Sequence, residues 1–286
     1  MSQSDSQTLL GQVAAEFATL PQVTAVVLAG SRRGPFSDVG SDFDLCVYAD
    51  PEPAEGWRAE LAGRFGERSS IGNHFWESGD EWVARHTGTV IDIMYRSPAW
   101  IEEQLDRVLL RHQASVGYST CFVHNVLYSQ ILYDREGWFA SLQARANQPY
   151  PEPLRRAVVA KNHPILRNTL SSYLHQITLA LARSDQVSVN HRTAALLASY
   201  FDILFAVNRL PHPGEKRLVA YVSANCLKRP PEFQQQVHDV LRATASGNET
   251  ELLARLHEML DGLDRLLLAE GLQKVPESSY FCTRLA

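Results

Sequence analysis

Residues 24–48 contain the most informative pattern of the chain: Thr-Ala-Val-Val-Leu-Ala-Gly-Ser-Arg-Arg-Gly-Pro-Phe-Ser-Asp-Val-Gly-Ser-Asp-Phe-Asp-Leu-Cys-Val-Tyr. The apolar run at 25–29 predicts a β-strand, and the run at 42–48 alternates with period two, as a strand does. The alternation places Asp42 and Asp44 on one face of that strand and Phe43 and Leu45 on the other. Two adjacent carboxylates repel each other, so we expect a cation between them, and such hard oxygen ligands suit Mg²⁺.

The loop between these two strands has the composition of a phosphate-binding loop. Glycine frees backbone N–H groups to approach a phosphate closely, and a serine hydroxyl stands at the start of the loop. Neighbouring arginines would add charge-assisted hydrogen bonds. The candidate triphosphate ligands are therefore Gly30, Ser31, Arg32, Arg33 and Ser41.

Together, Gly30-Ser31 and Asp42-Phe43-Asp44-Leu45 resemble the signature of the DNA polymerase β-like nucleotidyltransferase superfamily. The resemblance implies a third carboxylate on a later strand, and Asp92 interrupts the apolar run at 90–95 in the expected way. It implies a Mg²⁺-dependent enzyme with one or two ions, held by the three aspartates. The activity implied is transfer of a nucleoside monophosphate from ATP or another nucleoside triphosphate to a hydroxyl, with Asp92 completing the second metal site or acting as general base.

Each part of this motif also has an ordinary structural explanation. Asp-x-Asp on a strand edge is often only a solvated face, and Asp92 could cap a strand or pair with an arginine. The three parts occur in order, however, and apolar runs of strand length separate them. This conjunction favours the metal site over three unrelated structural roles.

The composition is that of an ordinary globular protein, with 45% hydrophobic and 21% charged residues among 286. The net charge of −5 argues against a protein whose main ligand is nucleic acid. The four cysteines show no C-x-x-C spacing, which makes zinc unexpected and favours a reducing, cytoplasmic location. Neither a secretory signal nor a membrane span is expected, because the N-terminus lacks the former's pattern and no apolar run is long enough.

The order of patterns predicts an α+β protein, with a small mixed-sheet nucleotidyltransferase head at 1–112 and an all-α helical bundle at 113–286. In the head we expect helices at 5–20 and 55–66 and further strands at 69–75 and 90–95, with a polar hairpin or loop between those strands. After Pro98 helical periodicity dominates. The expected helices are 100–110, 119–131, 153–182, 190–209, 214–226, 231–245 and 249–270.

Four residues of the second domain are candidate ligands, because a cleft between two domains is where a ligand usually binds. Lys161 would contact the nucleotide, and Asp202, Glu215 and Lys216 would contact the acceptor. The alternatives remain open at this stage: Lys161 on a solvated helix face, Asp202 as a paired buried acid, and Glu215 with Lys216 in a solvated helix turn.

Two domains of this kind resemble the aminoglycoside and lincosamide nucleotidyltransferases. The resemblance implies a small-molecule hydroxyl acceptor, with antibiotics as one such class. We expect a monomer or homodimer with no membrane partner. A cationic acceptor would need an acidic cleft with Asp202, Glu215 and Asp134. A tRNA acceptor would instead need basic residues, for which the candidates are Lys161, Arg167, Arg192, Lys216 and Arg217. The alternatives are a toxin–antitoxin-type enzyme that modifies a protein or a tRNA, and a degenerate nucleotide-binding regulator.

Overall fold

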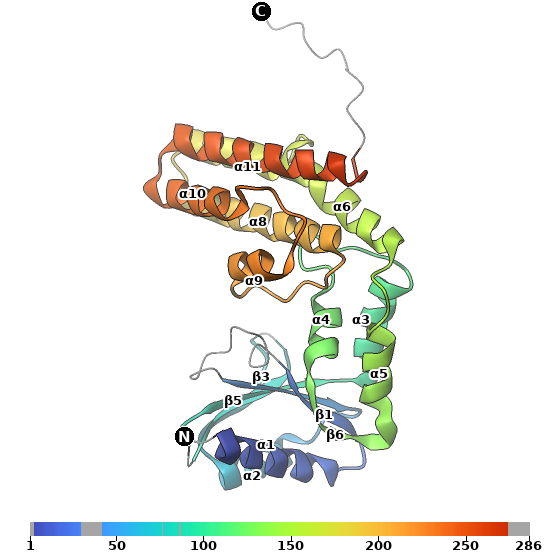
Figure 1. The fold of residues 1–286 in the computed structure, drawn as a ribbon. Helices are drawn as coiled ribbons and strands as arrows, with labels where there is room; N and C mark the ends of the chain where they lie inside the picture. Colours follow the sequence, from blue (N-terminus) through green and yellow to red (C-terminus); the bar gives the residue numbers. More distant parts are fainter. Residues whose placement is uncertain (1–2, 30–41, 76, 86, 274–286) are drawn as a thin grey trace, which may run out of the picture. The chain divides into compact units, whose positions relative to one another are not determined.

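The computed structural model describes residues 3–29, 42–75, 77–85 and 87–273. The chain forms two compact units. Met1–Arg111 and Phe122–Pro149 form the first, here called the sheet unit, and His112–Cys121 and Tyr150–Ala286 form the second, the helical unit. The chain passes from the sheet unit to the helical unit after Arg111, and residues 122–149 then return to the sheet unit. The predicted α+β class is confirmed (Figure 1).

The sheet unit is built on one mixed sheet with strand order β3-β4-β5-β2-β1-β6. Among the strands that the structure describes, β2 and β5 are parallel to each other, and the other neighbouring pairs are antiparallel. The strands are β1 Val23–Ala29, β2 Phe43–Ala49, β3 Gly66–Asn73, β4 Gly79–Ala84, β5 Val90–Arg96 and β6 Gln130–Asp134. The helices of this unit are α1 Gln3–Ala18, α2 Glu55–Phe65, α3 Pro98–Leu109, α4 Cys121–Tyr128 and α5 Trp138–Ala146.

Helices α1 and α2 cover one face of the sheet (Figure 1). Apolar side chains of β2 and β5 alternate toward these helices and form the core of the unit, as the period-two pattern predicts. In that core the ring of Phe17 packs against those of Trp57 and Tyr95, at centroid distances of 5.2 and 6.1 Å. This packing leaves the other face of the sheet for the aspartates.

Helix α5 packs on that other face, at the end of β2 remote from Asp44. The ring of Tyr48 lies 5.3 Å from that of Trp138 and 5.4 Å from that of Phe139. Helix α3 starts at Pro98, directly after β5. Ser97 caps it by accepting a hydrogen bond from the N–H of Trp100, and Pro98 occupies its first turn. Asp44 lies on this same face of β2, four residues before Tyr48.

Two strands of the sheet were not predicted from the sequence. Strand β4 lies where a polar hairpin or loop was expected, and β6 lies at the end of the expected helix 119–131, of which α4 keeps only Cys121–Tyr128. Strand β6 pairs with β1 and so covers an edge that the expected head would have left open. Asp134 at its end accepts hydrogen bonds from the N–H groups of Phe139 and Ala140, which fixes the start of α5.

The helical unit packs its helices around α8, of which more than half of the residues are buried. Its helices are α6 Glu152–Arg167, α7 Tyr173–Ala182, α8 Gln186–Asn208, α9 Leu218–Asn225, α10 Phe233–Ser246 and α11 Glu249–Ala269 (Figure 1). The all-α character expected for this part of the chain is therefore present. None of the described helices combines the length and the apolar character needed to cross a membrane.

One long helix expected in this unit is in fact two. The predicted helix 153–182 is interrupted at residues 168–172, between α6 and α7. Ser172 accepts a hydrogen bond from the N–H of His175 and so starts α7. Pro164 stays inside α6, in the last turn before the break. Helix α8 likewise starts earlier than expected, at Gln186, because Asp185 caps it.

Candidate active site

The two strands that carry the predicted acids are neighbours in the sheet, and their register places the acids directly side by side. In the parallel pair of β2 and β5, Asp44 is opposite Asp92. In the antiparallel pair of β4 and β5, Glu81 is opposite Asp92. Residues opposite one another on adjacent strands project from the same face. Glu81, Asp92 and Asp44 thus form a row of carboxylates across three strands, here called the acidic row.

The backbone explains why this row is not part of the core. Phe43 and Leu45 flank Asp44 and are buried on the side of α1 and α2, as Ile91 and Ile93 are on either side of Asp92. Alternation therefore turns Asp44 and Asp92 to the opposite face, where both are half-buried, and leaves Glu81 exposed. Asp42 precedes β2 and is exposed. The predicted segregation of acids and apolar residues along β2 is confirmed.

The electrostatics of Asp92 identify it as a carboxylate among like charges. Its pKa is raised above the ordinary value, first by burial and then by the negative charges of Asp44, Glu81, Asp42 and Glu77. Within the described part of the chain, no hydrogen bond or ion pair of its side chain compensates this repulsion. A cation bound beside Asp92 would relieve it.

The donor set fits a hard divalent cation that keeps other ligands of its own. Among the described residues, no group of three or more His, Cys, Asp or Glu side chains is arranged to hold a metal ion. Mg²⁺ usually binds through one or two carboxylates and fills its remaining positions with water and phosphate oxygens. Asp44 and Asp92, with Asp42 before the start of β2, therefore suit Mg²⁺ that keeps water or phosphate oxygens as its further ligands.

A buried arginine closes the acidic face at the end of β5. Arg96 makes two hydrogen bonds to the carboxylate of Glu77, each of 2.7 Å, and is 9% exposed. Its guanidinium lies over the rings of Trp100 and Phe122, 5.2 and 5.5 Å from their centroids. Residues 92, 94 and 96 share a face of β5, so this pair bounds the face on which the acidic row lies. The arginine holds Glu77, while Asp92 has no comparable partner in the described residues.

Sequence reasoning missed Glu81, Glu77 and Arg96. Glu81 lies in β4, where a polar hairpin or loop was predicted. The alternation of the exposed Glu81 with the buried Trp82 is the pattern of a strand, but it was not recognised. Arg96 directly follows the apolar run of β5 at the spacing i+4 from Asp92, a signal that the sequence did contain.

The loop predicted to bind the triphosphate lies outside the described residues. This applies to Gly30, Ser31, Arg32, Arg33 and Ser41, so their role stays a prediction.

In the helical unit, Asp202 has a clear local role. Its carboxylate accepts hydrogen bonds from the backbone N–H of Ser119 at 3.0 Å, from the hydroxyl of Ser119 at 2.6 Å and from the amide of Asn162 at 3.2 Å. It is 2% exposed, and burial raises its pKa to about 6 against the lowering effect of these hydrogen bonds. Asp202 thereby attaches residues 115–119 to helices α6 and α8.

The other candidates of this unit lie on its surface. Lys161 is exposed on α6, and Glu215 and Lys216 are exposed in the turn before α9. Among the described residues, no hydrogen bond or ion pair joins them to Asp202. Glu215 and Asp202 nevertheless both lie near Tyr118, whose pKa is raised first by burial and then by nearby charges that include these two carboxylates. Asp134, which was considered for a cationic acceptor, caps α5 in the sheet unit instead.

Comparisons with known proteins give likenesses among solved structures. No protein-family model and no curated protein matches the chain. Among solved structures, the chain is similar to the crystal structure of a nucleotidyltransferase-like protein from Exiguobacterium sibiricum 255-15, with 14% identity, a TM-score of 0.46, and coverage of 93% of this chain and 76% of that chain. That description names the broad class suggested by the sequence motif. At this identity and TM-score the likeness carries no argument about activity, which has to come from the residues of the site.

Proposed function

We propose that the sheet unit transfers a nucleoside monophosphate from a Mg²⁺-bound nucleoside triphosphate, with ATP as the first candidate, to a hydroxyl of a small-molecule acceptor. The observation that carries the proposal is the register of Asp44 against Asp92 on adjacent parallel strands, with Glu81 continuing the row. These carboxylates lie together, and among the described residues no partner compensates the charge of Asp92. Such an arrangement suits a site at which the cation binds together with the ligand of the protein. The sequence motif around Asp42 and Asp44, which resembles that of nucleotidyltransferases, supports a nucleoside triphosphate as this ligand.

Each acidic residue has a separate task in this proposal. Asp42 and Asp44 would hold one or two Mg²⁺ ions, and Asp92 would complete the second metal site or take the proton of the acceptor hydroxyl. Bound Mg²⁺ neutralises triphosphate charge and polarises the α-phosphate. The acceptor oxygen forms a bond to the α-phosphorus, the bond from that phosphorus to the bridging oxygen breaks, and pyrophosphate leaves. A raised pKa makes the Asp92 carboxylate a better proton acceptor than an ordinary aspartate.

The triphosphate would be held by the loop before Asp42, through Gly30, Ser31, Arg32, Arg33 and Ser41, with Lys161 as a further candidate. Glycine and backbone N–H groups suit close approach of phosphate oxygens.

A small-molecule acceptor is favoured over tRNA by the charge of the site. Glu81 is the exposed member of the acidic row, and its charge would repel a polyanion such as tRNA. An antibiotic acceptor remains one member of this small-molecule class. Modification of a tRNA would require a basic surface and would weaken steeply with salt.

The test measures nucleotide binding and transfer separately on the full chain. Calorimetric titration with ATP and Mg²⁺ should show binding that disappears with chelator, and ATP labelled at the α-phosphate should label a small hydroxylated acceptor with release of pyrophosphate. Asp44→Asn and Asp92→Asn should abolish transfer, whereas Glu60→Gln, an exposed acid of α2 on the opposite face, should not. Binding without pyrophosphate release would indicate a nucleotide-binding regulator, and labelling of RNA alone would overturn the proposed acceptor class.

A further inference from the structure

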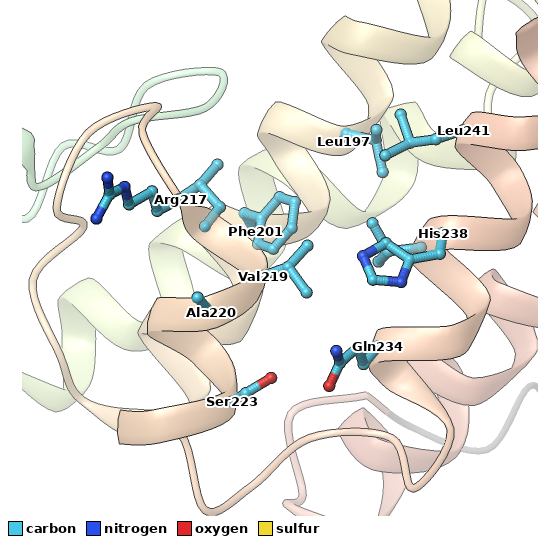
Figure 2. Close-up of a pocket in the computed structure, with 11 residues that line it drawn as sticks. Leu197, Phe201, Arg217, Val219, Ala220, Ser223, Gln234, His238 and Leu241 are labelled. Atoms are coloured by element: carbon cyan, nitrogen blue, oxygen red, sulfur yellow. The ribbon is translucent and has the colours of Figure 1, made fainter. Parts of the chain in front are cut away.

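The helical unit contains a pocket of about 430 Å³ between α8, α9 and α10 (Figure 2). All of its lining residues belong to this one unit. Small-molecule sites in proteins usually have volumes of about 300–1,000 Å³. The pocket is therefore large enough for a molecule of two fused rings.

One part of the pocket wall is apolar and comes from all three helices. Leu197 and Phe201 of α8 lie one helical turn apart, Val219 comes from α9, and Leu241 from α10. Figure 2 shows Leu197 and Leu241 close together at one end, with Phe201 and Val219 next to them. Leu241 is 47% exposed although it lines this pocket, so a ligand could still remove apolar surface from water there.

Arg217 also lines the pocket, but its guanidinium is directed away from the other labelled side chains (Figure 2). The rest of the wall carries three polar side chains. Ser223 of α9 and Gln234 of α10 point toward each other, and the imidazole of His238 lies on the pocket side of α10 one turn farther along (Figure 2). In the described structure, none of these three side chains has a hydrogen-bonding partner within the protein. A hydroxyl, an amide and an imidazole offer both donors and acceptors to a ligand.

The charges of the lining decide which ligand chemistry is suitable. Among the lining residues that the structure describes there is no aspartate or glutamate, and the guanidinium of Arg217 is directed away from the polar group of Ser223, Gln234 and His238 (Figure 2). A polycation such as an aminoglycoside would bury ammonium groups here without counter-charges, which is costly. A mostly apolar molecule with one hydroxyl would cover the apolar wall and place its hydroxyl among the three polar side chains.

We propose that this pocket binds a small, mostly apolar molecule that carries a hydroxyl group, such as a hydroxylated bicyclic aromatic compound. The ring system lies against Phe201 and Val219, and the hydroxyl is hydrogen-bonded within the group of Ser223, Gln234 and His238. No residue of the sheet unit takes part, so the proposal does not depend on nucleotidyl transfer.

The experiment uses 2-naphthol as the probe and naphthalene as the same ring system without the hydroxyl. Binding of both to the full chain is measured by ligand-observed NMR. Ala220→Trp fills the pocket and should weaken 2-naphthol binding about tenfold or more, which a loss of most ring contacts would produce. Ala224→Trp is the matched control, because Ala224 is an exposed alanine of the same helix that does not line the pocket. It should leave binding unchanged.

A second pair of variants tests the polar end. Gln234→Ala and His238→Ala should weaken 2-naphthol binding about fivefold, the effect of one hydrogen bond, and leave naphthalene binding unchanged. Both residues are exposed on α10, so the fold should survive, and far-UV circular dichroism checks this. Absence of saturable 2-naphthol binding, equal effects of the two tryptophan variants, or tighter binding of an aminoglycoside than of 2-naphthol would overturn the proposal.

Discussion

The two faces of the sheet hold aspartates in opposite ways. Asp80 points to the face covered by α1 and α2 and is 1% exposed. It accepts hydrogen bonds from Arg58 at 3.0 Å, from the hydroxyl of Tyr95 at 2.7 Å and from the N–H of Gly72 at 2.9 Å. Asp92, on the neighbouring strand and the other face, is half-buried among Asp44, Glu81 and Asp42. One acid is surrounded by donors and the other by acids.

This difference separates an acid that holds the fold together from one that, in our proposal, binds a ligand. The protein itself supplies the counter-charge of Asp80, because an unpaired buried charge would destabilise the fold. For Asp92 the counter-charge has to come from outside if the like charges are to be compensated. Exchanging a carboxylate for an amide on each face should therefore have opposite consequences.

The largest effect is expected on the acidic face. Asp92→Asn and Asp44→Asn should each lower the rate of transfer by on the order of 10³-fold or more, because metal-ion stabilisation of the transition state amounts to several kcal/mol. The melting temperature should stay the same or rise, because each change removes one of several repelling charges. Single-turnover kinetics and thermal unfolding of the same samples measure both. A variant that keeps wild-type turnover with Mg²⁺ would contradict the metal assignment.

Asp80→Asn should show the reverse pattern. It leaves the 2%-exposed guanidinium of Arg58 without its most buried partner. Because Arg58 keeps Glu52 at 3.1 Å, we expect the free energy of unfolding to fall by about 3 kcal/mol, the lower end of the cost of breaking a buried ion pair. Urea unfolding measures this, with Asp92→Asn as the matched change on the adjacent strand. Equal loss of stability in the two variants would remove the distinction between the faces.

Asp202 of the helical unit is a buried acid with hydrogen-bond donors but, among the residues that the structure describes, no cationic partner, so it lies between the cases of Asp80 and Asp92. It should make the stability of the protein depend on pH. Its pKa is raised to about 6, so between about pH 4 and 6 the folded chain holds a proton that the unfolded chain has lost. This group's contribution to stability is present at the acidic end and falls by about 3 kcal/mol as the pH rises through 6. Comparing urea unfolding of the natural chain and Asp202→Asn from pH 4 to 7 isolates it. The difference in stability between the two proteins should change in favour of the variant as pH rises; a pH-independent difference would refute the assignment.

The smallest effect is expected at the outer end of the acidic row. Glu81 is exposed, and exposed charge interactions contribute less than about 1 kcal/mol. Glu81→Gln should therefore change the affinity for Mg²⁺ and ATP by less than about fivefold. Calorimetry at low and high salt measures this, since a long-range effect of charge is screened by salt. A loss as large as that of Asp92→Asn would make Glu81 a direct ligand.

The sequence was sufficient to predict the alternating strand β2, its two acids, and the later strand with Asp92. It predicted the helical second part as well. These elements were predictable because their apolar periodicity is continuous and the burial follows it. The pairing of β2 with β5 could not be predicted from the sequence, because strand order depends on contacts between residues that are far apart in the chain.

Two strands, β4 and β6, could not be predicted from the sequence, each for a different reason. In β4 the buried residue Asp80 is an acid, so the alternation of buried and exposed positions does not appear as an alternation of apolar and polar residues. In β6 the sequence Gln-Ile-Leu-Tyr-Asp continues an apolar helical pattern, and only pairing with β1 makes it a strand. Likewise, Asp202 in an apolar helix is a visible signal, but its partner Ser119 is 83 residues away.

The return of residues 122–149 to the sheet unit has a consequence for how the chain can fold during synthesis. The edge of β1 stays unpaired until β6, which ends at Asp134, has left the ribosome. Helix α5, which packs on Tyr48, emerges later still. A nascent chain that stops near residue 112 would expose both an open strand edge and an aromatic surface, the features through which partly made sheets aggregate.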